Sequence, residues 1–271
     1  MKIGISTACF YPRLLEEGIE RIASLGLRTI EIFFNTESEF REPFVSELAR
    51  LIREYDLELI SVHPYTSLME GMLLFSEHTR RTEDGFEQYR RYFATAAGLG
   101  AKYLTLHGER QMPGMQDSPA AAERKLERYH RLCRTAAEEG VIVAQENVAW
   151  CRSCNPDYVK LLAQNIPELC YTLDIKQAHR AGHSWREYFR IMAPRLVNVH
   201  INDFDETHSC LLPGEGIFDY AELFGALRDA GYNNQTLIEV YSSNYADESQ
   251  IADAARFLHA KAQDAGYTID R

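Results

Sequence analysis

The sequence predicts a (β/α)8 barrel, or TIM barrel, formed as a single domain by residues 1–271. Short apolar runs alternate with segments of helical apolar spacing along the whole chain, and eight such pairs can be counted. Repeated strand–helix units predict parallel strands with right-handed connections, and eight units in this length suit a closed barrel better than an open sheet. Six of the runs end in His, Asp or Glu, so we expect one mouth of the barrel to collect these side chains.

The expected strands are apolar runs bounded by turn or helix signals, a pattern typical of buried parallel strands. The clearest run is LCYTL, which stops at the carboxylate of Asp174. Others end at polar groups in the same way, as TLIEV does with Glu239. The expected strands are residues 2–6, 29–33, 57–63, 103–107, 141–146, 169–173, 196–201 and 235–240.

The expected helices lie between these runs. Gly26, Gly140 and Gly231 each follow a helical segment, where glycine commonly ends a helix. Pro43 and the Asn155-Pro156 pair are start signals. The expected helices are residues 14–25, 43–55, 86–99, 119–139, 155–164, 183–192, 219–230 and 247–265.

Three connections, residues 64–84, 108–118 and 203–216, are long enough to shape a binding site. The first contains an apolar cluster that could form a lid over the site, make a subunit contact in a homo-oligomer, or pack against the barrel. Its members are Leu68, Met69, Met72, Leu73, Leu74 and Phe75. The sequence leaves these three alternatives open.

Charge and composition restrict the partners. The chain has 29 basic and 40 acidic residues, a formal charge of −11, which disfavours binding to nucleic acid or to an acidic membrane. No run approaches the ~20 apolar residues of a membrane span, and the first residues, MKIGIST, lack a signal-peptide pattern. The six cysteines are scattered, and the CRSC pair has no partner pair with zinc-site spacing. We therefore expect a cytoplasmic protein with a small-molecule partner.

Four polar residues at the ends of consecutive strands indicate a metal site. Glu146, Asp174, His200 and Glu239 end strands five to eight, which are neighbours around a barrel. Three carboxylates and an imidazole suit one divalent ion such as Mn²⁺, Mg²⁺, Co²⁺ or Zn²⁺. Without a cation, such close carboxylates would repel and raise the pKa of at least one of them.

Motifs over nearly the whole chain resemble the sugar phosphate isomerase/epimerase family of xylose isomerase-like barrels, whose superfamily includes endonuclease IV. The motifs are IEIFF, SVHP, TLHGE, ENV, LDIKQAHRAGH, VHINDF, LPGEGIFDY and IEVY. The four strand-end residues match the family's metal ligands one by one. The resemblance implies a metal-dependent isomerase acting on a small ketose, polyol-derived ketone or sugar phosphate.

The same resemblance implies that Glu146 and Glu239 are the catalytic pair. One carboxylate would remove a proton beside the carbonyl, and one would return it, through an enediolate. Return on the opposite face gives epimerisation, whereas return to the adjacent carbon gives aldose–ketose isomerisation.

Four further residues are expected to contact the substrate. His63 and His107 match strand-end histidines of the family and would bind substrate oxygens, or simply hydrogen-bond within the mouth. Lys176 follows Asp174 by two residues and would share its orientation if the strand continued, to bind an oxyanion or phosphate or to form a salt bridge. Glu215, in LPGEG, is expected at the rim or on the substrate.

Two smaller expectations concern the surroundings of these residues. Asp203 is expected to support His200. Phe33, Phe34 and Trp150 could form an apolar wall for the sugar, although core packing is the default for such residues.

Other functions remain open on the same barrel: an inosose dehydratase-like lyase, an endonuclease IV-like phosphodiesterase and a non-catalytic sugar-binding barrel. The nuclease pattern has a His three residues after the strand-six Asp, where this chain has Gln177. Its Asp-x-His pair after strand seven also has no clear match. The paired acids argue against a barrel that only binds.

Overall fold

The computed structural model describes residues 1–112, 114 and 117–269, and eight parallel strands form a closed barrel in it. Each strand pairs with its neighbours in sequence, and β1 closes the barrel against β8 through pairs such as Ile3 with Thr236. The predicted (β/α)8 barrel is confirmed. The strands are β1 Lys2–Ser6, β2 Thr29–Phe33, β3 Glu58–His63, β4 Tyr103–Leu106, β5 Ile142–Glu146, β6 Cys170–Asp174, β7 Leu196–Ile201 and β8 Gln235–Ile238.

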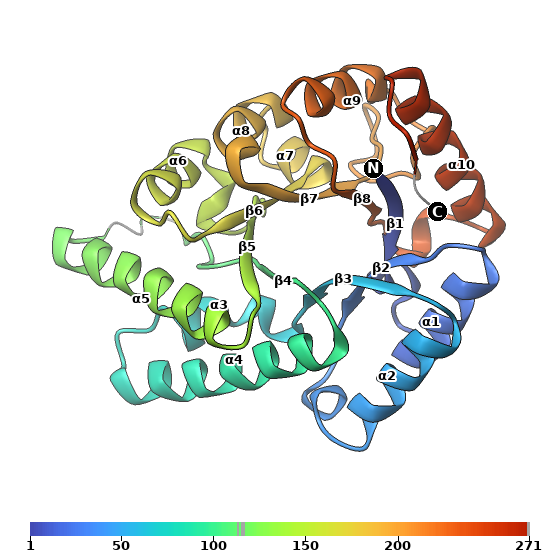
Figure 1. Ribbon diagram of the computed structural model, residues 1–271. Coiled ribbons are helices and arrows are strands. Elements are labelled where there is room, and N and C mark those ends of the chain that lie inside the picture. Colours follow the sequence, from blue (N-terminus) through green and yellow to red (C-terminus); the bar gives the residue numbers. More distant parts are fainter. Residues whose placement is uncertain (113, 115–116, 270–271) are drawn as a thin grey trace.

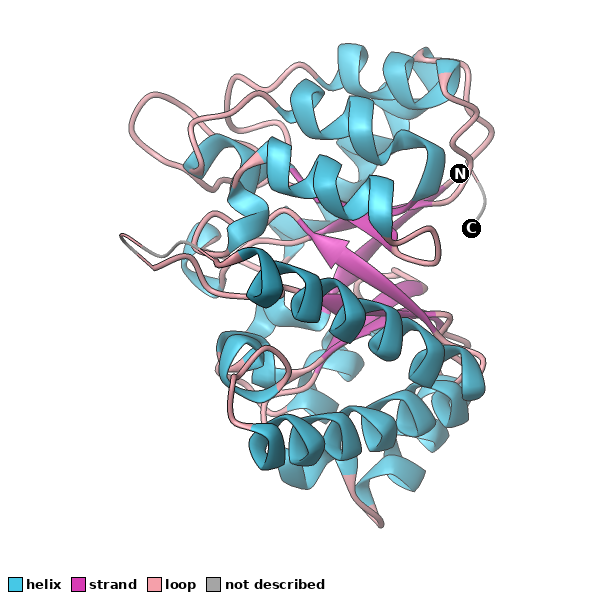
Figure 2. Ribbon diagram, turned by 90° about the vertical axis from the view of Figure 1, so that its left-hand side faces the viewer, coloured by secondary structure: helices cyan, strands magenta, loops and turns pink. Residues whose placement is uncertain are grey.

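Helices surround the strands on the outside (Figure 1), and the view from the side shows the strands enclosed between them (Figure 2). Each long helix buries one apolar stripe, as α2 does with Leu48, Leu51 and Ile52. The eight expected helices are α1 Leu15–Ser24, α2 Phe44–Glu54, α4 Thr79–Leu99, α5 Pro119–Glu138, α6 Pro156–Asn165, α8 Trp185–Met192, α9 Tyr220–Asp229 and α10 Ser249–Asp264. Two short helices, α3 Glu70–Leu73 and α7 Ile175–Arg180, add to them.

The expected boundaries agree with the structure to within two residues, except that α4 begins at Thr79 rather than at residue 86. The first two turns of α4 are mostly polar, so apolar spacing could not reveal them. The His78 side chain caps the helix by accepting a hydrogen bond from the Arg81 N–H. Gly85 lets α4 approach α3, because a Cβ at this position would lie 2.7 Å from the Leu73 carbonyl oxygen.

Residues 64–84 have helical structure of their own, a 3₁₀ turn over Tyr65–Leu68 followed by α3. The apolar cluster of this segment divides in two. Leu74 and Phe75 are buried in the core, as packing on the barrel predicts, whereas Leu68 and Met72 are 64% and 60% exposed. Packing therefore accounts for only part of the cluster.

Glu70 fixes the same segment to the end of β4. Its carboxylate is fully buried, accepting one hydrogen bond from the Tyr89 hydroxyl at 2.7 Å and another from the Gly108 N–H at 2.5 Å. Burial raises the pKa of Glu70 to about 8.

Among the described residues, no helix is both long enough and apolar enough to cross a bilayer.

Candidate metal centre and active site

Four neighbouring strands bring together the quartet, which is Glu146, Asp174, His200 and Glu239. Glu146 ends β5, Asp174 ends β6 opposite His200 of β7, and Glu239 follows β8. All four are buried, and each offers one ligand atom such that these atoms lie within 4.8 Å of one another. The geometry that the strand ends predict is therefore present.

The backbone at the end of β6 is held so that one Asp174 oxygen faces the quartet. The Asn147 amide makes two hydrogen bonds to the Asp174 backbone, at 2.8 and 2.9 Å. Asp174 Oδ1 accepts from the Gln177 N–H at 2.9 Å and so starts α7. Asp174 Oδ2 is buried without a hydrogen-bond partner and has an ion pair with Lys176 Nζ at 3.4 Å, so a divalent cation would give it a direct partner. With hard oxygen donors and one imidazole, the quartet fits such an ion.

The carboxylates perturb one another as expected. Burial, together with the Glu146 and Glu239 charges and against the opposing Lys176 ammonium, raises the pKa of Asp174 to about 7. Burial would also raise the pKa of Glu239, but Lys176 and then His200 bring it well below its usual range. The pKa of Glu146 is likewise lowered despite burial, with His107 as the main cause. Asp174 is thus the carboxyl of the quartet whose pKa is raised, with burial as the main cause and the neighbouring carboxylates adding to it.

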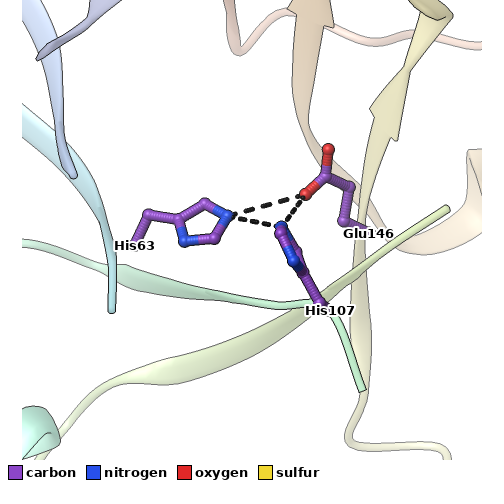
Figure 3. A group of neighbouring side chains, drawn as sticks. All are labelled: His63, His107 and Glu146. Atoms are coloured by element: carbon purple, nitrogen blue, oxygen red, sulfur yellow. Dashed lines mark hydrogen bonds and ion pairs between the residues drawn. The ribbon is translucent and has the colours of Figure 1, made fainter. Parts of the chain in front are cut away.

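Glu146 also belongs to a second group, with His63 at the end of β3 and His107 after β4 (Figure 3). The two Nε2 atoms are 2.7 Å apart, and they lie 3.7 Å (His63) and 3.0 Å (His107) from Glu146 Oε2. The Nδ1 atoms of both rings are buried without hydrogen-bond partners. The expected hydrogen bonding within the mouth is present, and Glu146 joins the two groups.

Glu31 is a further part of the centre, and the pattern of polar strand ends does not reveal it. It lies in the middle of β2 with no exposed surface, and its Oε2 is 3.4 Å from His200 Nε2. The same oxygen accepts from the hydroxyls of Ser61 and Thr105 at 2.7 and 3.1 Å. The available signal was a charged residue inside an apolar strand, since a buried acid needs partners.

Lys176 reaches the quartet by a different route from the one expected. The strand does not continue past Asp174, because α7 begins at Ile175. Within its first turn the buried Lys176 Nζ lies 2.9 Å from Glu239 Oε2 and 3.4 Å from Asp174 Oδ2. Of the predicted alternatives, the structure contains the salt bridge.

The structure corrects one other expectation and narrows a second. Asp203 does not support His200: its carboxylate accepts from the N–H groups of Phe204, Phe218 and Gly214, and so shapes the loop after β7. Gly216 is required there, because a Cβ would collide with the Asp203 carboxylate. Glu215 is exposed in this loop and does not line the cavity above the quartet, so of its two expected positions the rim agrees with the structure, and contact with substrate stays a prediction.

A cavity of about 410 Å³ opens above these groups. The buried polar part of its lining, which we call the floor, contains His63, His107, Glu146, Lys176 and Glu239. Asp174 and His200 are fully buried and do not line the cavity. The remaining lining is mainly aromatic and aliphatic and includes Phe33, Tyr65, Leu68 and Trp150. The expected wall is therefore present for Phe33 and Trp150, whereas Phe34 packs in the core.

The barrel fold and the polar groups at its mouth agree with one family of proteins. The chain belongs to the xylose isomerase-like TIM barrel family, whose model matches residues 19–261. It is similar to the fructoselysine 3-epimerase of Shigella flexneri, with 25% identity over 266 residues that cover 93% of this chain and 94% of that enzyme.

Solved structures share the fold. A D-tagatose 3-epimerase-like protein matches with a TM-score of 0.80 and 18% identity, over 97% of this chain and 99% of that one. The IolI protein, whose crystal structure contains a zinc atom, also has a TM-score of 0.80, with 14% identity over 99% and 100% of the two chains.

Proposed function

We propose that the protein is a metal-dependent sugar epimerase or isomerase that moves a proton beside the carbonyl of a keto-sugar. The observation that carries the proposal is the placement of Glu146 and Glu239 at the ends of β5 and β8, lining one cavity. The similarity to fructoselysine 3-epimerase along most of the chain supports it.

Glu146, Asp174, His200 and Glu239 would hold one divalent ion. When bound, this ion would polarise a carbonyl and lower the pKa of the neighbouring C–H group. The buried Asp174 Oδ2 without a hydrogen-bond partner supports the assignment. The zinc atom in the IolI structure agrees with it.

The two glutamates would carry the proton. The lowered pKa of each keeps it ionised near neutral pH, which is the state a base needs. Because they come from strands that are not neighbours, they can approach a bound sugar from two sides. Removal by one, followed by return on the opposite face from the other once it has taken a proton from solvent, would invert the carbon.

Lys176, His63 and His107 would bind the oxygens. The Lys176 ammonium stands beside Glu239 and can donate to an oxygen that gains negative charge as the proton leaves. His63 and His107 line the same floor and can bind hydroxyl groups. The substrate would thus be held at several oxygens while one C–H faces a carboxylate.

The test is solvent exchange. Ketoses, inososes and sugar phosphates are incubated with the protein and Mn²⁺ in D₂O, and NMR follows deuterium at carbon. We expect deuterium in a substrate carbon, and loss of at least about 10²-fold in exchange rate in Glu239→Gln. Glu222→Gln, an exposed change on α9, is the matched control and should exchange normally.

Metal content is measured for each variant, since a weakened metal site would also reduce exchange. Turnover without deuterium incorporation would contradict proton transfer through exchangeable carboxylates. Loss of water from an inosose would identify a lyase instead.

A DNA phosphodiesterase is the second candidate, favoured by the group of His63, His107 and Glu146. At the position where the nuclease pattern has a His, Gln177 instead accepts a hydrogen bond from the Ala149 N–H at 3.1 Å. We expect no incision of abasic-site duplex at physiological salt. Robust metal-dependent incision would reverse the ranking.

A further inference from the structure

The cavity above the quartet changes from polar at its floor to apolar at its mouth. On the walls, the Phe33 ring lies 4.6 Å from the ring of His63, and the Trp150 ring lies 5.1 Å from the ring of His107. Each histidine of the floor therefore has an aromatic neighbour. These two rings would contact the carbon skeleton of a sugar whose oxygens reach the floor.

Three large side chains form the mouth: Tyr11, Leu68 and Tyr241. They come from separate segments, after the 3₁₀ turn Thr7–Phe10, at the end of Tyr65–Leu68 and after β8, and all three line the cavity. Their exposed fractions are 62%, 64% and 44%. Large apolar groups exposed together around a polar site indicate a ligand that covers them.

Hydrogen bonds hold the segments of the mouth in place, so the exposed side chains belong to an ordered surface. The Ser242 hydroxyl donates to the Tyr11 carbonyl at 2.6 Å, which joins the first and third segments. Arg180 Nη1 donates to the Tyr241 hydroxyl at 2.7 Å and its guanidinium lies over the ring at 5.3 Å. Tyr241 is thereby held at the cavity, where the Lys176 Nζ also lies over its ring, 5.1 Å from the centroid.

The charges argue against a phosphate in the cavity. Among the described residues that line it, Lys176 is the single lysine or arginine. Its ammonium is already engaged by Glu239 and Asp174, at 2.9 and 3.4 Å. The proposed function assigns this one ammonium and the divalent ion to the oxygens of the keto-sugar, so a phosphate would have no further cation in the lining and would face the carboxylates of the floor at a net energetic cost.

We propose that the natural substrate is an unphosphorylated keto-sugar joined to an apolar or aromatic group, and that Tyr11, Leu68 and Tyr241 bind that group. The sugar would occupy the floor and walls, with its substituent directed outward. A bare ketose carries hydroxyls along its length and would leave the hydrocarbon of the mouth in water. This inference rests on the proposed function for the sugar part, but the mouth can be tested separately.

The test measures binding of two inert sugars by calorimetry, phenyl and methyl β-D-glucopyranoside, in the Mn²⁺-loaded protein. Neither has a carbonyl, so binding does not depend on turnover. We expect the phenyl compound to bind at least about tenfold more tightly, as burial of a ring against apolar side chains predicts. Leu68→Ser should remove most of this preference without changing the affinity for the methyl compound. Leu161→Ser, at a partly exposed leucine on α6 outside the cavity, is the matched control and should keep the preference.

Absence of a phenyl preference, or a preference that survives Leu68→Ser, overturns the inference. So does tighter binding of glucose 6-phosphate than of the phenyl compound. The 3-keto derivatives of the same two glucosides are then compared in the D₂O assay. Exchange in neither, combined with a phenyl preference that needs Leu68, would refute the proposed reaction while leaving the mouth as a binding site.

Discussion

Lys176 Nζ lies 2.9 Å from Glu239 Oε2, inside a group of carboxylates that also suits a divalent ion. The ammonium and the ion would share Glu239 and Asp174 as partners. Both therefore offset the same negative charge. Removal of the ammonium should increase the stabilisation that the bound ion gives to the folded protein.

Lys176→Met tests this relationship. Without metal, the variant should be less stable than wild type by about 3 kcal/mol, because removing one partner leaves buried carboxylates uncompensated. Saturating Mn²⁺ should recover part of this loss, so the rise in Tm on adding Mn²⁺ should exceed that of wild type. Lys160→Met, at an exposed lysine of α6, is the control. Equal Mn²⁺-induced rises in Lys176→Met and wild type would show that the ammonium and the ion do not compete.

The quartet is tested directly by metal analysis. The double change Asp174→Ala, His200→Ala removes two of the four donors, and we expect bound Mn²⁺ to fall from about one per chain to near zero. Circular dichroism should confirm that the barrel still folds. Unchanged metal content in a folded double variant would place the ion elsewhere.

Glu31→Gln should weaken the metal site without removing a ligand. Glu31 Oε2 lies 3.4 Å from His200 Nε2 and so favours a proton on that nitrogen, leaving Nδ1 to face the other three residues. Loss of the negative charge should lower the Mn²⁺ affinity by about 10–100-fold, measured by calorimetry. Thr105→Val, which removes only one donor to Glu31, should have a smaller effect. An unaltered affinity in Glu31→Gln would mean that this carboxylate does not orient His200.

Glu70 predicts a pH dependence of stability. Its pKa is raised from 4.5 to about 8 by burial, so the folded protein binds a proton that the unfolded chain has lost above pH ~4.5. The contribution of Glu70 is therefore fully present below pH ~4.5 and declines as the pH rises to about 8, by a few kcal/mol. In Glu70→Gln this decline should be absent.

Urea denaturation between pH 4.5 and 8.5 measures the effect as the difference between wild type and variant. Glu87→Gln, at an exposed position of α4, should follow wild type. A constant difference between wild type and Glu70→Gln over this range would show that Glu70 keeps an ordinary pKa.

The barrel and the quartet can be predicted from the sequence because both follow from local sequence patterns. Apolar runs that stop at a polar residue define a strand end, and closure of the barrel then brings Glu146, Asp174, His200 and Glu239 together. The start of α4 was missed because its first turns carry no apolar stripe and depend on the His78 cap.

The partners of the quartet depend on tertiary contacts. Glu31 meets His200 across the barrel from a strand far away in sequence, and no local pattern records that approach. Lys176 was expected on an extended strand, and it reaches Glu239 from the first turn of a helix instead. Asp203 is two residues from Ile201, the end of β7, yet its carboxylate accepts hydrogen bonds from three N–H groups of the following loop.

Because Asp203 anchors the loop after β7, the placement of His200 and the shape of that loop depend on different contacts. His200 is fixed by β7 and its partners in the barrel, while the loop after it is tied at Phe204, Gly214 and Phe218 to one carboxylate. Between these ties, residues 206–208 are exposed. Insertions or replacements there can accumulate through evolution without moving the imidazole, so relatives can diversify this part of the rim while they inherit the same centre.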